Sequence, residues 1–136
     1  MKNNILAALM VTGASLVAGS AFAGDIAKGE KEFKKCKSCH AIVDDAGNAI
    51  VKGGKTGPNL YGVVGRTIAS GDFNYSKALV EAGESGTVWT VEGVAAFSEN
   101  PNNYLKELGV SGRSKMSFKM RKNSEDVAAY LASLTQ

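Results

Sequence analysis

The pentapeptide Cys36-Lys37-Ser38-Cys39-His40 combines two thiols, three positions apart, with an imidazole that follows at once. The chain contains no other cysteine and no other histidine. Two thiols at this spacing can add across the two vinyl groups of a haem, and the adjacent histidine can then bind the iron from one side. This pattern is the attachment signature of c-type haem. The sequence therefore predicts one covalent haem on Cys36 and Cys39, with His40 as an iron ligand.

A Cys-x-x-Cys pair is also compatible with a redox-active dithiol, a structural disulfide or part of a zinc site. A structural zinc site needs about four protein ligands, and the pentapeptide supplies fewer. A thioredoxin-like dithiol is expected in an α/β context, and no convincing strand is predicted nearby. A plain disulfide would not require His40. Haem attachment is the favoured interpretation, and a thiol-redox or disulfide module without haem is the alternative.

The first 23 residues have the organisation of an export signal. Lys2 provides a positive start, residues 5–17 are mostly apolar, and Ala21-Phe22-Ala23 matches an A-x-A cleavage site. An uncleaved membrane anchor is the alternative, but residues 5–23 would barely span a bilayer. We therefore expect a cleaved signal peptide over residues 1–23, a single domain over residues 24–136 and a periplasmic location.

The mature chain would have 113 residues, enough for one domain with a small core. Loss of Lys2 with the signal lowers the formal charge from +3 to +2. A charge this small, without a nucleic-acid-binding motif, argues against binding to nucleic acid. The lysines gather near the haem motif and again around residues 115–122. Such gathering indicates either an ordinary solvated surface or a positive face that steers an acidic partner.

The pattern along the chain predicts short helices joined by long Gly-rich loops. Asp25 is expected to cap a first helix that carries Phe33 inward and runs into the haem motif. Residues 44–74 show no steady period and predict a loop. Further helices are expected over 75–82, stopped by Gly83, over 91–99, capped by Thr90, and from Pro101 to about 107.

The last helix has the clearest pattern. Asn123 or Ser124 is expected to cap it, and its apolar residues follow a 3.6-residue period: Val127, Tyr130, Leu131 and Leu134. This stripe must be buried against another element. The first helix is the expected partner, because Gly29 would allow a close approach and Phe33 would pack beside it.

A sixth iron ligand, if protein-derived, cannot be a second histidine, so a methionine thioether is the remaining good candidate. Outside the signal the methionines are Met116 and Met120, both in a polar stretch. Methionine is often a core filler, and spacing alone does not choose between the two. A His/Met pair raises the reduction potential of a haem and suits an electron carrier.

Several runs occur together and in order across the mature chain. They are the Cys-x-x-Cys-His motif, Thr56-Gly57-Pro58-Asn59-Leu60-Tyr61-Gly62-Val63-Val64-Gly65-Arg66, Phe73-Asn74-Tyr75, Trp89, Asn100-Pro101 and Lys115-Met116-Ser117-Phe118. In these runs the chain resembles the class I cytochromes c, and among them the bacterial periplasmic c2 type. The resemblance implies an all-α cytochrome c fold, with short helices and long loops wrapped around one covalent haem c.

The resemblance also implies roles for individual residues. The family's axial methionine precedes one residue and then Phe, which matches Met116 and leaves Met120 to packing. Pro58 matches the proline whose carbonyl accepts a hydrogen bond from the axial imidazole. The donors near the haem propionates are matched by Arg66, Tyr75 and Trp89. Phe97 departs from the pattern, since many members have a tyrosine there that hydrogen-bonds near the methionine sulfur.

The implied function is that of a soluble electron carrier, not an enzyme, with no small-molecule substrate. The donor would be a membrane quinol–cytochrome c reductase, and the acceptor a terminal oxidase or a photosynthetic reaction centre. Transient docking would use a lysine face around the haem edge, formed by Lys37, Lys55, Lys115 and Lys119. A monomer is expected because no exposed apolar stripe calls for a partner. A small haem peroxidase or gas sensor, with Met116 not bound to iron, is the alternative function.

Overall fold

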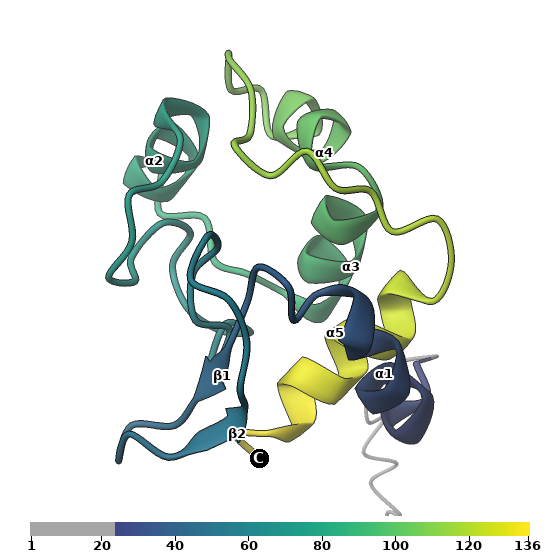
Figure 1. Ribbon diagram of the computed structural model, residues 1–136. Coiled ribbons are helices and arrows are strands. Elements are labelled where there is room, and N and C mark those ends of the chain that lie inside the picture. The colour runs from purple at the N-terminus through teal and green to yellow at the C-terminus, as the bar shows by residue number, and fades with distance from the viewer. Residues whose placement is uncertain (1–23) are drawn as a thin grey trace, which may run out of the picture.

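A computed structural model describes residues 24–136 (Figure 1), and the predicted signal peptide over residues 1–23 lies outside them. Within the described range the elements are α1 (Ile26–Glu32), a 3-10 turn (Phe33–Lys35), β1 (Ile42–Val43), β2 (Ala49–Val51), α2 (Lys77–Glu84), α3 (Val91–Glu99), α4 (Pro101–Glu107) and α5 (Ser124–Ser133). None of these helices has the length and apolar composition needed to cross a membrane. The predicted all-α fold is confirmed, with a small β-hairpin in addition.

Side-chain caps fix where the first four helices begin. Asp25, Ser76 and Thr90 each accept a hydrogen bond from the backbone N–H three residues further on, at the starts of α1, α2 and α3. Asn100 does the same for α4, and Pro101 occupies the first turn, where its missing N–H costs nothing. The bounds of α3 and α4 are those predicted from the sequence.

The prediction of a loop throughout residues 44–74 is wrong at its start. Strand β2 pairs antiparallel with β1, which places Ile42 opposite Val51. Asp44 closes the turn between the strands, because its carboxylate accepts hydrogen bonds from the backbone N–H groups of Ala46 and Asn48. A strand of three largely exposed residues has too little alternation of polarity to be recognised in the sequence.

The prediction that Gly83 stops α2 is also wrong. The helix continues through Gly83 to Glu84, and the left-handed residue that follows it is Gly86, with φ of 82°. Gly83 is needed for another reason. A Cβ atom there would lie 2.1 Å from the carbonyl oxygen of Ile68, so glycine lets α2 pack directly on the preceding loop.

The first and last helices cross closely at Gly29, as the sequence predicts. A Cβ atom on Gly29 would lie 1.9 Å from the carbonyl oxygen of Asp126 and 2.9 Å from the Cβ of Tyr130. Beside the crossing, the rings of Phe33 and Tyr130 lie 5.9 Å apart. The absence of a side chain at this one position therefore sets the spacing between α1 and α5.

Polar contacts at the start of α5 reinforce this crossing. Asn123 precedes the helix in the left-handed conformation, with φ of 65°, and makes no side-chain capping bond. Asp126 in the first turn accepts a hydrogen bond from the backbone N–H of Asp25 (2.8 Å). Its other oxygen pairs with the ammonium group of Lys28 (2.9 Å). The two ends of the described chain are thus joined by charge as well as by packing.

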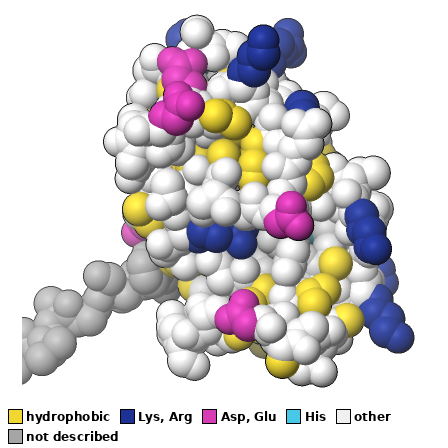
Figure 2. All heavy atoms as spheres, turned by 90° about the vertical axis from the view of Figure 1, so that its left-hand side faces the viewer, with side chains coloured by type: hydrophobic (Ala, Val, Ile, Leu, Met, Phe, Trp, Pro, Cys, Tyr) yellow, Lys and Arg dark blue, Asp and Glu magenta, His cyan; other side chains and the backbone are white. Residues whose placement is uncertain are grey.

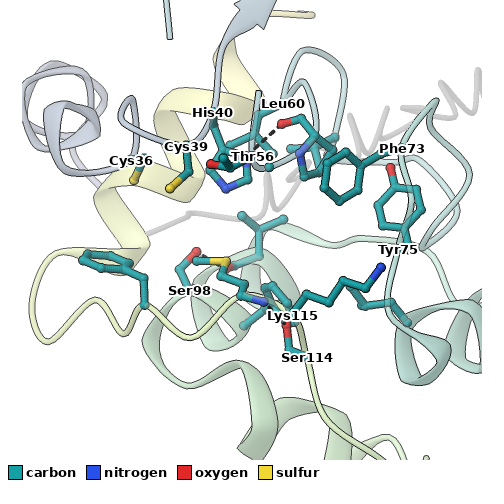
Figure 3. A pocket seen from close by; sticks show the side chains of 18 of the residues that line it. Cys36, Cys39, His40, Thr56, Leu60, Phe73, Tyr75, Ser98, Ser114 and Lys115 are labelled. Carbon is teal, nitrogen blue, oxygen red and sulfur yellow. Dashed lines mark hydrogen bonds between the residues drawn. The ribbon is translucent and has the colours of Figure 1, made fainter. Parts of the chain in front are cut away.

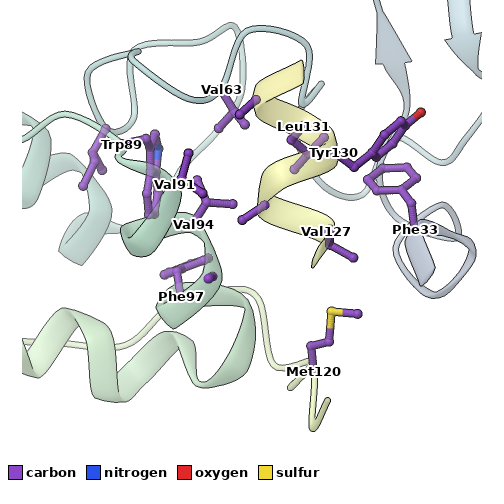
Figure 4. Close-up of a cluster of buried hydrophobic side chains, with 14 of the residues drawn as sticks. Phe33, Val63, Trp89, Val91, Val94, Phe97, Met120, Val127, Tyr130 and Leu131 are labelled. Atoms are coloured by element: carbon purple, nitrogen blue, oxygen red, sulfur yellow. The ribbon is translucent and has the colours of Figure 1, made fainter. Parts of the chain in front are cut away.

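The hydrophobic core extends from this crossing to α3 (Figure 4). Apolar side chains of α3 and α5 face one another, and the buried set shown includes Val91, Val94, Phe97, Val127 and Leu131. Trp89, just before α3, lies edge-on to Phe97, with ring centroids 5.1 Å apart. Val94, Phe97, Val127 and Leu131 also line a cavity, so α3 and α5 serve as walls of the site described next.

Candidate haem site

A cavity of about 300 Å³ lies between the Cys-x-x-Cys-His motif and the segment between α4 and α5. Its size is in the range of small-molecule and cofactor sites. The lining brings together all the residues predicted at the site, from five separate parts of the chain: Cys36, Cys39, His40, Pro58, Arg66, Tyr75, Trp89 and Met116. Nothing in the sequence spacing alone requires these segments to meet.

The motif itself folds as a turn that continues the first helix. The backbone N–H groups of Cys39 and His40 both donate to the carbonyl of Cys36, at 3.1 and 3.0 Å. The turn directs both sulfurs along one edge of the cavity, where they lie side by side (Figure 3). Burial raises the pKa of Cys36 to about 11. A hydrogen bond from Thr56 lowers the pKa of the exposed Cys39.

His40 is held in one orientation. Its Nδ1 lies 2.8 Å from the carbonyl oxygen of Pro58, which can only accept, so Nδ1 carries the proton and donates it. The other ring nitrogen, Nε2, points into the cavity (Figure 3). Gly57 packs on the ring, since a Cβ atom there would lie 2.4 Å from Cε1 of His40. Burial lowers the pKa of His40, which favours the neutral imidazole that metals bind.

The opposite wall comes from the end of α3 and the segment after α4. Figure 3 shows Ser98, Ser114 and Lys115 across the cavity from His40. Met116 lies in this wall, half-buried, and its backbone N–H donates to the Ser114 hydroxyl (3.0 Å). Met120 is buried in the hydrophobic core and does not line this cavity. The fold therefore separates two methionines that sequence spacing leaves equivalent.

Three further lining residues carry hydrogen-bond donors. The guanidinium of Arg66 donates to two backbone carbonyls of the preceding loop, each at 3.3 Å. A Cβ atom on Gly71 would lie 2.6 Å from the Tyr75 hydroxyl and 3.6 Å from Cζ of Arg66, so both groups flank this glycine. Trp89, whose indole carries an N–H, also lines the cavity. These three side chains are donors suited to carboxylates.

Three lining residues have roles that the sequence interpretation did not assign. Thr56 lowers the pKa of the Cys39 thiol, Gly57 supports the imidazole, and Ser98 presents a hydroxyl that donates to the Val94 carbonyl (2.7 Å). The sequence gives a signal for Gly57, because a glycine directly before a proline often marks a place where the backbone closely approaches another group. Thr56 and Ser98 carry no comparable signal. Phe97 lies in the lining and has no hydroxyl to offer a methionine sulfur.

The chemistry of this lining fits a covalent haem. Two thiols lie on one edge, an oriented imidazole and a thioether lie on different walls, and donors for carboxylates lie elsewhere in the lining. The remaining walls are largely apolar, with Leu60, Val63, Leu79, Val94 and Leu131. In residues 24–136 no group of three or more His, Cys, Asp or Glu side chains could hold a metal ion.

The residues of the lysine face, Lys37, Lys55, Lys115 and Lys119, are all exposed. Two of them, Lys37 and Lys55, belong to the motif side, and the other two to the Met116 segment. Lys115 is less free than the others, because its ammonium group donates to the carbonyl of Asn74 (2.8 Å). Figure 2 shows one face of the molecule, where hydrophobic side chains reach the surface and Lys and Arg side chains lie at the top, near the middle and along the right-hand side.

The chain is similar to known proteins over its whole length. It is 50% identical to cytochrome c2 of Rhodobacter capsulatus, with all of both chains covered. It is 46% identical to cytochrome c-550 of Paracoccus denitrificans, over 97% of this chain and 88% of that one. No protein-family model matches the chain.

Solved structures agree with this similarity. The structure of cytochrome c2 from Rhodobacter capsulatus superposes with a TM-score of 0.81 at 52% identity, covering 83% of this chain and all of the other. Ferric cytochrome c-550 from Paracoccus versutus gives a TM-score of 0.79 at 48% identity, covering 83% and 99%. The chain therefore belongs to the bacterial cytochrome c2 family, the class I c-type cytochromes that carry electrons on one covalent haem c and are not enzymes.

Proposed function

We propose that this chain is a periplasmic one-electron carrier in which His40 and Met116 bind the haem iron from opposite sides. The observation that supports this most strongly is the placement of the two side chains. His40 directs Nε2 into the cavity from one wall (Figure 3), and Met116 is in the lining next to Lys115, which lies across the cavity from His40. When bound, the haem supplies an iron couple that gains and loses one electron.

The protein residues would act by holding this group and tuning its surroundings. The hydrogen bond from His40 to Pro58 fixes the tautomer and the direction of the imidazole. The soft thioether of Met116 would favour the reduced metal and so raise the reduction potential. Cys36 and Cys39 would hold the group covalently. With both faces of the iron engaged, no position remains where a peroxide or another substrate could react.

Arg66, Tyr75 and Trp89 would donate hydrogen bonds to the haem carboxylates. Carboxylates placed against an apolar wall are costly unless such donors compensate for the lost water. The three donors line one cavity. Trp89 would combine this role with packing, because its ring is buried against Phe97.

Members of this family act with membrane redox complexes. We propose a membrane quinol–cytochrome c reductase as donor and a terminal oxidase or photosynthetic reaction centre as acceptor. Docking would be brief and guided by the lysine face, whose four ammonium groups lie on exposed side chains. Residues 1–23 would direct export and be removed, which leaves a monomeric domain starting at Gly24.

A matched pair of variants tests the iron ligand. Met116→Leu and Met120→Leu each remove one sulfur and nearly conserve volume, so neither should unfold the protein. The oxidised wild type should show a weak red absorption band from sulfur-to-iron charge transfer. Met116→Leu should lose this band and lower the reduction potential, whereas Met120→Leu should keep both. A band that survives in Met116→Leu would overturn the proposed ligation.

A further inference from the structure

The segment that carries Met116 has no regular structure of its own. Between α4 and α5 the backbone forms neither helix nor strand, so few of its polar groups have partners within an element. Such a segment keeps one conformation only where other parts of the protein bind its backbone. At its far end, the backbone N–H of Met120 donates to the carbonyl of Ser98 on α3 (2.8 Å).

The near end is held by a side chain of α4. The amide oxygen of Asn102 accepts a hydrogen bond from the backbone N–H of Ser114 (2.9 Å), and the Ser114 hydroxyl in turn accepts from the backbone N–H of Met116 (3.0 Å). Both bonds are partly shielded from water. Two successive bonds therefore connect the second residue of α4 to the backbone of Met116.

Asn102 is well placed for this task because α4 is anchored at its start. Asn100 caps the helix, Pro101 is buried in its first turn, and Leu105 is fully buried one turn further on. Asn102 is half-buried and does not line the haem cavity. Any effect of this residue on the iron must therefore pass through the segment that it holds.

We propose that Asn102 is a positioning residue that, through Ser114, keeps the Met116 sulfur at the iron. This inference rests on the His40/Met116 ligation proposed above. It requires an acceptor oxygen at position 102 and does not require an amide nitrogen. Asn102→Ala removes the acceptor, whereas Asn102→Asp keeps an oxygen at the same reach and leaves the bond from Ser114 possible.

Added imidazole provides the test, because it must displace the methionine to bind ferric iron. The haem-loaded ferric protein is titrated with imidazole, and loss of the charge-transfer band is followed. Loss of one shielded hydrogen bond should tighten apparent imidazole binding roughly three- to tenfold in Asn102→Ala. Asn102→Asp should stay within about twofold of wild type, since an acceptor remains. The matched control is Asn103→Ala, because Asn103 is the next residue of α4 and is exposed.

The outcomes separate this inference from the proposed ligation. If Asn102→Ala matches Asn103→Ala while Met116→Leu loses the band, the ligation stands and the role of Asn102 is refuted. If the wild type has no band, the ligation fails and the inference fails with it. Asp126→Asn should weaken the fold at the distant α1–α5 crossing, because it removes the charge that pairs with Lys28, so it serves as a stability control. If it tightens imidazole binding as much as Asn102→Ala does, general loosening of the fold is responsible, and a specific positioning role is refuted.

Discussion

Adding a single methyl group at Gly29 should destabilise the whole fold. The new Cβ of Gly29→Ala would lie 1.9 Å from the carbonyl oxygen of Asp126, about 1.5 Å closer than ordinary contact. This oxygen belongs to the backbone of α5 and cannot rotate away, so the two helices must separate. Overpacking of this kind costs about 1–3 kcal/mol, and a backbone clash belongs near the top of that range. The higher helix propensity of alanine offsets up to about 1 kcal/mol of this destabilisation.

We therefore expect Gly29→Ala to lower the free energy of unfolding by about 2 kcal/mol. Guanidinium titration of the haem-loaded protein, followed by far-ultraviolet circular dichroism, measures this difference if the slope of the transition is unchanged. Glu30→Ala is the control, because Glu30 is exposed on the same helix, and its effect should stay within about 0.5 kcal/mol. A Gly29→Ala protein as stable as the wild type would refute the close crossing of α1 and α5.

Three further predictions concern charge and processing. At Asp126, the hydrogen bond from the backbone of Asp25 and the ammonium of Lys28 hold the pKa below its ordinary value. Its stabilising effect is complete above about pH 5 and fades as the pH falls through its unfolded value near 4 towards the lower folded one. Denaturant titrations between pH 5 and 3 should therefore show a smaller loss of stability in Asp126→Asn than in wild type, and equal losses would contradict this pairing. Lys37→Ala should weaken the dependence of the electron-transfer rate on ionic strength with an anionic redox partner in stopped-flow measurements. An unchanged salt dependence would remove Lys37 from the docking surface. The exported protein should begin at Gly24 by mass spectrometry, and a retained leader would contradict cleavage after Ala23.

The parts of the fold that could be predicted are those set by local interactions. Thr90 and Asn100-Pro101 stand within one turn of the helices that they begin, so α3 and α4 were predicted with the observed bounds. The apolar stripe of α5 likewise had to pack against another helix, and Gly29 indicated where α1 could approach it closely. The β-hairpin and the continuation of α2 through Gly83 could not be predicted in this way. The hairpin strand is short and largely exposed, so its polarity shows little alternation. The course of α2 depends on its contact with distant backbone, between Gly83 and Ile68.

The site, too, has parts that follow from local sequence and parts that depend on distant contacts. The thiols and His40 form one local motif, and their chemistry follows from residue type and spacing. Met116 and Met120 are equivalent by that criterion, and family resemblance was needed to prefer Met116. The structure gives them different surroundings, since Met116 lines the cavity and Met120 is buried in the core. Asn102 could not be found from the sequence, because an amide that binds backbone twelve residues away leaves no periodic signal.

The spin state of the oxidised protein tests most directly whether both faces of the iron are engaged. Electron paramagnetic resonance of the ferric, haem-loaded protein at neutral pH should show only low-spin, six-coordinate iron, as expected when His40 and Met116 both bind. A predominant high-spin, five-coordinate signal would contradict the account and would indicate an iron open to peroxide or gas ligands.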